Sequence, residues 1–550
     1  MYRISEMQPG QRGRHIARGW ILEAYTVMLL AVFPFYSTDQ YFSILSDRAA
    51  FFRAATLLMA AALLAEWMLF IIVSLFRKDR LPYTSYGETD ISRTAGFVGN
   101  FTIGCKKIPP EYLFFFAFLF ISALSTLWSE YPLKAWNGEA GRRQGLSIWL
   151  LYGVSFFCVT RFFRPKKWHL CLFLAAGAIA ALWGICDYMG PGLSWWLADV
   201  KETQKNMFTS SIGNINTYTA FMAVCFSLSG TYIVHADMPD QKRLAFLLLL
   251  FSLFSTALIT GRSDNAVISI AAFFLVLPLT ITDTWKAGRY FCLLAAFDAA
   301  FPQVGFLSGY TKNPYLAGHE GILLGFCADS RTIILAFILG STAATAAIFF
   351  SAGTEHPMHR FWKIWAAFLA VSVMLLALVL VHANFFADPE QYGAIGAYLR
   401  FDDSWGTHRG LCWRLAFESY TSFPSVKKLI GSGPETFGII MKKEHYKEMI
   451  QGCGQIFDSP HNEFIQYLFC TGILGATCYY GFLAACFVKG IRGDAVRKAT
   501  AVAILVYVAV SLVNISVPIT QPYLILMAAW CASGRKSREL RSERKMHWKI

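Results

Sequence analysis

The sequence contains little charge for its length. Only 15% of its 550 residues are Asp, Glu, Lys or Arg, against roughly 25% in soluble domains. A soluble globular protein of this length is therefore excluded. The thirteen cysteines form no Cys-x-x-Cys pair and no Cys/His spacing typical of zinc ligands. We therefore expect no metal site.

Two further absences narrow the class of protein. No small-residue cleavage site follows the first apolar run after the basic head MYRISEMQPGQRGRHIARGW, so we expect no cleavable signal peptide. The stretch GSGPETFG at 431–438 has no preceding strand, so we interpret it as a turn and not as a dinucleotide loop. We expect no cofactor.

The net charge of +14 does not require nucleic acid as a partner, because basic loops beside anionic lipid account for it.

Hydrophobic residues, in contrast, make up 55% of the chain, and the mean hydropathy is +0.44. They recur in runs of about sixteen to twenty-five residues, each long enough to cross a hydrocarbon core roughly 30 Å thick. The sequence therefore predicts an all-α polytopic integral membrane protein. We expect about fourteen spans (about twelve to fourteen), near residues 21–36, 54–76, 111–128, 146–160, 171–188, 216–234, 244–260, 266–282, 290–307, 331–350, 363–383, 464–488, 498–515 and 519–533.

Lys and Arg residues predict the orientation of these spans, because cytoplasmic loops carry an excess of both. With a cytoplasmic N-terminus, four basic segments also fall inside: 76–80, 161–169, 489–498 and 534–550. We expect a bacterial cytoplasmic (inner) membrane protein with both termini in the cytoplasm. The expected parts are a membrane body over 1–383, a large extracytoplasmic loop with amphipathic helices over 384–463, three spans over 464–533 and a basic cytoplasmic tail over 534–550.

A few basic residues fall on the predicted outer face, in unusual positions. Arg262 lies in a short turn between two apolar spans, Arg142 and Arg143 precede the fourth span, and Arg409 lies within the long loop. For a single Arg, snorkelling to lipid headgroups is an equally good explanation. Four on one face, together with His461 at the start of an apolar run, favour a functional site there.

The same segments resemble the O-antigen ligase and polymerase family of bacterial membrane glycosyltransferases, over roughly residues 120–530. The resemblance rests on WNGEAGRRQGL before a span, GNINTYTAF at 213–221 and TGRSDNA at 260–266. It continues with THRGLCWRLAFESYTSFPSVKKLIGSGPETFG and SPHNEFIQYLFCTGILGA. The short turn has Gly-Arg-Ser where family members usually have Ser-Arg-Gly.

This resemblance implies a helical body like that of C-type glycosyltransferases, and an enzyme that needs no metal ion. Members transfer a glycan from a polyprenyl (undecaprenyl) diphosphate carrier to an acceptor hydroxyl at the outer face of the membrane. In ligases the acceptor is a lipid A-core sugar of lipopolysaccharide, and in polymerases it is another repeat unit. The implied partners are the lipid-linked donor, a glycan, lipid or protein acceptor, and membrane lipids.

The candidate residues suit that chemistry. A guanidinium binds phosphate bidentately and stays charged at any working pH, so Arg262 and Arg409 are predicted to hold the diphosphate and stabilise the departing charge. His461, with an ordinary pKa near 6.5, is the predicted general base. The predicted substrate-binding residues are Arg142, Arg143, Asn462 and Asn214. Asn462 either orients His461 or caps the following helix, and Glu463 is interpreted as a first-turn charge that favours the helix dipole.

A polytopic transporter or lipid flippase is the alternative from another class. Glu23, Glu66, Asp187 and Asp298 fall inside or near predicted spans, and intramembrane carboxylates can serve proton relays. Scattered carboxylates are more often paired with neighbouring helices, and the polar residues here gather on one outer face, so we favour the enzyme. A disulfide between two cysteines of the outer loop, Cys412 and Cys453, is allowed by the compartment.

Overall fold

The computed structural model describes residues 9–76, 108–190, 195–237, 240–316, 321–352, 361–388, 390–393 and 396–533. The predicted cytoplasmic tail 534–550 and nearly all of the basic segment 76–80 lie outside these residues. Helices dominate the described chain. Its strands are β1 (Phe208–Thr209) and β2 (Gly213–Asn214), which pair antiparallel. The all-α prediction is confirmed.

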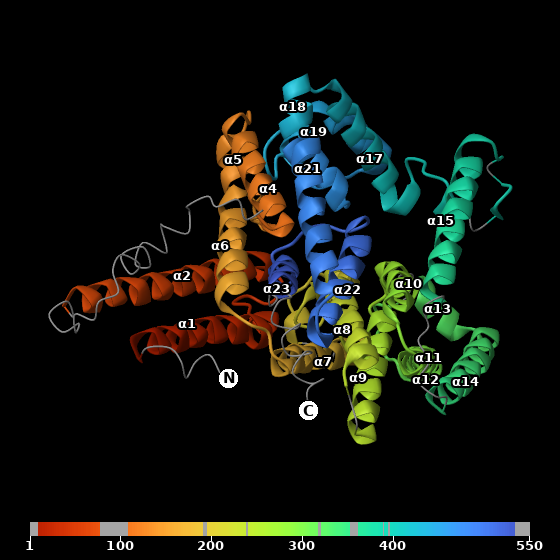
Figure 1. Cartoon of the computed structure of the whole chain (residues 1–550). Helices are drawn as coiled ribbons and strands as arrows, with labels where there is room; N and C mark the ends of the chain where they lie inside the picture. Colours follow the sequence, from red (N-terminus) through yellow and green to blue (C-terminus); the bar gives the residue numbers. More distant parts are fainter. Residues whose placement is uncertain are drawn as a thin grey trace.

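The helices before the long loop make up the N-terminal body of the protein (Figure 1). They are α1 (Pro9–Val27), α2 (Ile44–Phe76), α4 (Pro110–Leu127), α5 (Pro132–Asn137), α6 (Leu146–Phe162), α7 (Lys167–Met189), α8 (Ile215–His235), α9 (Gln241–Thr260), α10 (Asn265–Val276), α11 (Thr284–Asp298), α12 (Ala300–Tyr310), α13 (Ile322–Ala328), α14 (Ser330–Ala352) and α15 (Phe361–Phe385).

The remaining helices form the loop and the C-terminal part of the body. They are α16 (Gly396–Leu399), α17 (Trp405–Ser422), α18 (Ser425–Ile430), α19 (Phe437–Glu444), α20 (Tyr446–Cys453), α21 (Glu463–Gly490), α22 (Ala495–Ser511) and α23 (Gln521–Ala532). Figure 1 shows α17, α18 and α19 gathered over the upper end of α21, which runs through the middle of the molecule.

Ten helices of the described chain are long and apolar enough to cross a membrane by length and composition, which supports a multi-pass membrane protein. Three further predicted spans coincide with shorter apolar helices, Leu146–Phe162, Asn265–Thr280 and Gln521–Ala532. The remaining predicted span, 498–515, coincides with α22. A helix therefore lies at every predicted position. The number of helices that cross the bilayer, about fourteen on the hydropathy argument, stays a prediction.

The environments of these apolar helices differ in a way that their sequences do not reveal. The apolar window of α8 is 100% buried inside the protein, whereas that of α15 is 0% buried. Helix α8 packs against α9, α10 and α22, so it forms the centre of the body, with Phe221 and Phe226 in its core. An apolar helix that no protein covers requires lipid around it, so α15 lies at the periphery.

The loop between α15 and α21 has an apolar core of its own. Leu411 and Leu415 of α17 and Met441 of α19 are buried there, together with Phe469 of α21. This packing joins the loop to the first turns of α21, which carry the segment around His461. The loop is therefore a folded cap on the end of that helix.

Helix α21 is broken at Gly472, whose φ of 68° is accessible to glycine. A Cβ there would stand 2.2 Å from the backbone oxygen of Leu429, so only glycine allows this close approach. The break frees two carbonyls, which are satisfied from the loop: Ser432 N donates to Phe469 O at 3.1 Å and Gly433 N to Cys470 O at 2.9 Å. The stretch 431–438 is thus a turn, as predicted, and the structure adds that it docks on a kinked helix.

Segments predicted to share the outer face lie together. Ser129 Oγ donates to Ser432 O at 2.6 Å, which joins the segment after α4 to the loop. Asn514 Nδ2 donates to Asn216 O at 3.3 Å, which joins the turn after α22 to the start of α8. Regions hundreds of residues apart therefore meet at the end of the bundle that carries the cap.

Segments predicted to share the inner face also lie together. Lys166 Nζ is 3.2 Å from Glu23 Oε1, which links the basic 161–169 segment to the N-terminal helix. Arg497 Nη2 donates to Cys531 O at 3.0 Å, which links the 489–498 segment to the end of α23. This grouping agrees with the predicted alternation of loops. Which face meets the cytoplasm stays a prediction.

Candidate active site

The segment Ser459–Glu463 enters α21 in a tightly held conformation. Asn462 is the N-cap of α21, and its Oδ1 accepts from Ile465 N at 3.1 Å. Trp413 Nε1 of α17 donates to Pro460 O at 2.7 Å, which ties the segment to the cap. His461 itself has a φ of 50°, a left-handed conformation that costs energy in a non-glycine residue. Its backbone is therefore held by neighbours on both sides.

The imidazole of His461 is kept neutral by its surroundings. Burial and the charges of Arg409 and Arg142 together lower its pKa to about 4, while the charge of Asp458 opposes them. A neutral imidazole at pH 7 can accept a proton. The charge of Arg409 acts on His461 at short enough range to perturb its pKa, so the structure brings these two predicted residues together.

Arg409 follows a sharp reversal at the start of α17. Gly406, Thr407 and His408 have φ values of 58°, 59° and 67°, and a Cβ on Gly410 would stand 1.8 Å from Asp402 O. The half-buried Arg409 guanidinium has no hydrogen bond or ion pair within the described chain. Burial lowers its pKa, and the charge of Asp264 opposes that effect.

Arg262 lies in the turn between α9 and α10, beside Asp264. Its side chain is buried, with 9% of the residue exposed, and its Nη1 has no partner among the described residues. Burial lowers its pKa. The turn is held from two sides. Ser263 Oγ donates to Asn216 Oδ1 at 2.6 Å. Gly321 packs against the Arg262 backbone, and a Cβ added to this glycine would stand 3.0 Å from Arg262 C.

Arg142 is placed quite differently from these two arginines. Its Nε is 3.1 Å from Glu435 Oε2 and its Nη1 is 2.7 Å from Asp458 Oδ2, while Nη2 donates to Asp458 O at 2.8 Å. Its guanidinium is fully occupied by the protein. It ties the segment before α6 to the GSGPETFG turn and to the residues just before His461.

Of the other predicted substrate-binding residues, one is exposed and two form the N-caps of helices. Arg143 is exposed beside Arg142. Asn214 caps α8, where its Oδ1 accepts from Asn216 N at 2.9 Å. Asn462 likewise uses its Oδ1 as a cap, and its Nδ2 has no acceptor within the described chain.

Backbone strain is concentrated in these segments. The non-glycine residues with positive φ in the described chain are Gln40, Arg143, Ser210, Arg262, Thr407, His408, Glu435 and His461. Six of these eight belong to the segments that carry the candidate residues. Such conformations cost about 1–3 kcal/mol each and persist where the surrounding structure imposes them, typically at functional sites.

Part of the chain is similar to a known protein family. Residues 321–480 match the family model described as O-antigen ligase. Over this range the chain is similar to O-antigen ligases. The match supports the predicted assignment to the O-antigen ligase and polymerase family, and it contains Arg409 and His461, whereas Arg142 and Arg262 precede it. No curated protein matches the chain.

Two residues of the candidate site were missed by sequence reasoning. Glu435 binds Arg142 and lines the cavities below the loop. The sequence feature that could have identified it is an acidic residue within a turn that contains Gly and Pro. Asn216, two residues after the predicted Asn214, holds the Arg262 turn. Both were hidden because their partners lie far away in the sequence.

One group of side chains in the loop before α21 has the composition of a metal site. Ligand atoms of Glu418, His445 and Glu448 lie within 4.8 Å of one another. Arg414 already bonds to Glu418 and to Glu448, each at 2.9 Å. The guanidinium supplies the positive charge that a cation would bring, and none of the three residues lines the cavities near His461.

The two loop thiols and the carboxylates of Glu23, Glu66 and Asp187 have ordinary roles. Cys412 and Cys453 are free thiols in this structure. Glu66 pairs with Arg18 at 2.8 Å, and Asp187 Oδ2 accepts from Ser210 N at 2.7 Å. These two carboxylates, like Glu23, are bound by neighbouring segments, which is the arrangement expected of structural charges and not of a proton relay.

Proposed function

We propose that the protein is a metal-independent glycosyltransferase that transfers a glycan from a polyprenyl diphosphate carrier to an acceptor hydroxyl. The reaction takes place at the outer face of the bacterial inner membrane, in the assembly of cell-surface polysaccharide. One observation carries the proposal: the guanidiniums of Arg262 and Arg409 have no hydrogen bond or ion pair to a carboxylate in the described chain, and the charge of Arg409 acts on a neutral His461.

The contrast among the arginines supports this choice. Arg142 and Arg414 are neutralised by carboxylates of the protein. Arg262 is buried and Arg409 is half-buried, and neither guanidinium has a hydrogen bond or ion pair in the described chain. A buried cation without an anion is costly. A bound diphosphate would supply the missing negative charge to both guanidiniums, with the bidentate geometry that Arg provides.

The proposed step is a single displacement at the anomeric carbon of the donor. The acceptor oxygen forms the new bond to that carbon, and His461 takes the hydroxyl proton on its free ring nitrogen. The bond between the anomeric carbon and the phosphate oxygen breaks, and its electron pair leaves with the diphosphate. Arg262 and Arg409 stabilise the charge that develops on the leaving oxygen.

The role of Arg142 in this proposal is positioning. Its three bonds to Glu435 and Asp458 fix the segment that leads into His461. Arg143 is exposed beside Arg142 and has no partner in the described chain, so it is a candidate contact to substrate. The Nδ2 of Asn462 is a further candidate, since its Oδ1 alone is used as the cap.

The test measures donor binding and glycan transfer on the same purified variants. His461→Ala should bind donor normally and lose about 10²–10⁴-fold in transfer, which is the usual contribution of a positioned base. Arg262→Lys and Arg409→Lys should weaken donor binding, because an ammonium cannot form the bidentate fork. His445→Ala and Arg414→Lys, in the same loop, are the matched controls. Transfer by His461→Ala at the wild-type rate would make the imidazole structural.

Ligation and polymerisation differ in the acceptor, and both remain within this proposal. A deletion strain separates them through its surface glycans. Loss of long glycan with accumulation of lipid-linked polymer indicates ligation, and accumulation of single lipid-linked repeats indicates polymerisation.

A further inference from the structure

Glu463 lies two residues after His461, in the first turn of α21, and its side chain is buried. Its Oε1 is 2.7 Å from the Tyr507 hydroxyl of α22, and its Oε2 is 3.3 Å from the Tyr479 hydroxyl of α21. Gln521 of α23 bonds to the same two tyrosines, with its Oε1 3.0 Å from the Tyr507 hydroxyl and its Nε2 3.3 Å from the Tyr479 hydroxyl. These four buried side chains, the Glu463 ring, join the three helices that follow the loop.

The Glu463 carboxyl has no cation bound to it within the described chain. Arg142 lines the same small cavity as Glu463, but its nitrogens bond to Glu435 and Asp458. The remaining titratable neighbours of Glu463 are tyrosines, namely Tyr467, Tyr479, Tyr480 and Tyr507. A buried carboxylate without a cation is costly, and the favourable field of a helix N-terminus offsets only a small part of that cost. The surroundings therefore favour the neutral acid.

The hydrogen-bond geometry of the Glu463 ring favours the same form. The Tyr507 hydroxyl carries one proton but faces two oxygens, Glu463 Oε1 and Gln521 Oε1. With an ionised Glu463, one of these contacts would join two oxygens with no proton between them. Turning the Gln521 amide over moves the conflict to Tyr479, which would then face two oxygens at 3.3 Å. A proton on Glu463 removes the conflict, because Glu463 then donates to Tyr507 and Tyr507 donates to Gln521.

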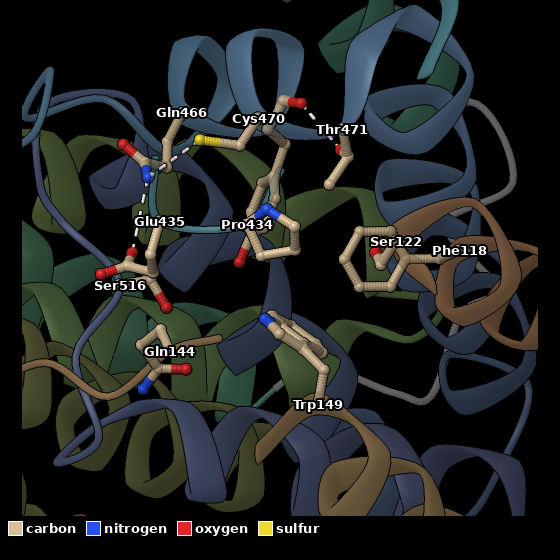
Figure 2. A pocket seen from close by; sticks show the side chains of 11 residues that line it. Phe118, Ser122, Gln144, Trp149, Pro434, Glu435, Gln466, Cys470, Thr471 and Ser516 are labelled. Atoms are coloured by element: carbon tan, nitrogen blue, oxygen red, sulfur yellow. Dashed lines mark hydrogen bonds between the residues drawn. The ribbon is translucent and has the colours of Figure 1, made fainter. Parts of the chain in front are cut away.

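The loop side of the same helical turn is held separately. Gln466, three residues after Glu463, donates its Nε2 to Glu435 Oε1 at 3.4 Å (Figure 2). The other oxygen of Glu435 accepts from Arg142 Nε at 3.1 Å. The start of α21 is thus fixed to the loop through Gln466 and to α22 and α23 through the Glu463 ring. Because His461 directly precedes this turn, both attachments set the direction in which its backbone leaves the helix.

From this we infer that Glu463 is a neutral carboxylic acid at pH 7 and that the ring it completes positions His461 for proton transfer. The positioning role rests on the proposed function, whereas the protonation of Glu463 does not. Glu463 is a positioning residue and not a catalytic one, since both of its oxygens are occupied within the ring. The sequence favoured a first-turn charge at this position, and the ring replaces that interpretation with an uncharged acid.

The first test measures protonation directly, on the full chain in detergent at pH 7 and without substrate. The infrared spectrum of Glu463→Gln is subtracted from that of the wild type. The difference should contain the carbonyl stretch of a protonated carboxylic acid. Glu130→Gln is the matched control, because Glu130 is 55% exposed and pairs with Lys427 and Lys443, so its difference spectrum should contain the bands of an ionised carboxylate. Carboxylate bands in the Glu463→Gln difference would overturn the inference.

The second test measures kcat and the donor KM of glycan transfer. Glu463→Ala and Tyr507→Phe should each lower kcat by about ten- to a hundred-fold and leave the donor KM unchanged, because they displace His461 without touching the arginines. Glu463→Gln should restore kcat to within about twofold of the wild type, since an amide also accepts and donates in the ring. Tyr480→Phe, on the same helix outside the ring, is the control.

The outcomes separate the positioning role from the proposed function. Wild-type kcat in both Glu463→Ala and Tyr507→Phe would overturn the positioning role. A loss of kcat in Glu463→Gln as large as in Glu463→Ala would show that the carboxyl itself is needed and would also overturn it. Absence of transfer by the wild type would contradict the proposed function, and the infrared difference would still decide whether Glu463 is neutral.

Discussion

Replacement of Arg142 by Gln tests whether this arginine positions the site or binds substrate. The Arg142 and Glu435 side chains are each 6% exposed, whereas Asp458 is 64% exposed. Removing one partner of a buried ion pair costs about 3–5 kcal/mol, because the other charge stays buried without compensation. The exposed contact with Asp458 adds at most about 1 kcal/mol. We therefore expect Arg142→Gln to lower the free energy of unfolding by about 3–5 kcal/mol.

The measurement is an unfolding titration in mixed micelles, followed by donor binding and transfer on the folded fraction. Arg142→Gln combined with Glu435→Gln should recover most of the lost stability, since neither charge then remains buried. The neighbouring exposed Arg143→Gln should change stability by less than about 0.5 kcal/mol. Folded Arg142→Gln should bind donor but transfer slowly, because the backbone leading to His461 is no longer held. Unchanged stability with lost donor binding would refute this reasoning and make Arg142 a substrate ligand.

Three further predictions concern pH, metal and topology. Transfer needs a neutral His461, so kcat/KM should be constant near pH 7 and fall as pH drops through the lowered pKa of this histidine, about 4; a midpoint at 6.5 or higher would contradict the burial argument. Transfer by purified enzyme should survive EDTA, because the arginines take the diphosphate charge; a loss that Mg²⁺ or Mn²⁺ restores would contradict their assignment. A reactive-cysteine tag within 384–463 should label from outside intact cells, and a tag after Arg535 should not; labelling of both from one side would show that the three spans after the loop are miscounted.

Much of this protein is encoded in contiguous stretches of sequence. The helices at the predicted spans follow from apolar runs, because the cost of unsatisfied backbone in lipid leaves helix as the local solution. The N-cap at Asn462 and the turn at 431–438 are also encoded locally. Gly431 and Gly433 permit the positive φ values that this turn needs. His461 was accessible to sequence reasoning for a related reason: an imidazole directly before a long apolar helix, within a matching set of short motifs, is a local pattern.

Only the tertiary structure distinguished one arginine from another. Arg142 and Arg262 look alike in sequence, each a basic residue at the end of a span. One is neutralised by Asp458, which lies 316 positions away, and the other is buried without a partner in the described chain. The walls of the small cavity below the loop have the same origin, since Ser122, Gln144 and Gln466 come from three distant elements. Ion pairs and unpaired polar atoms depend on which segments meet in space, and hydropathy and local spacing carry no information about those meetings.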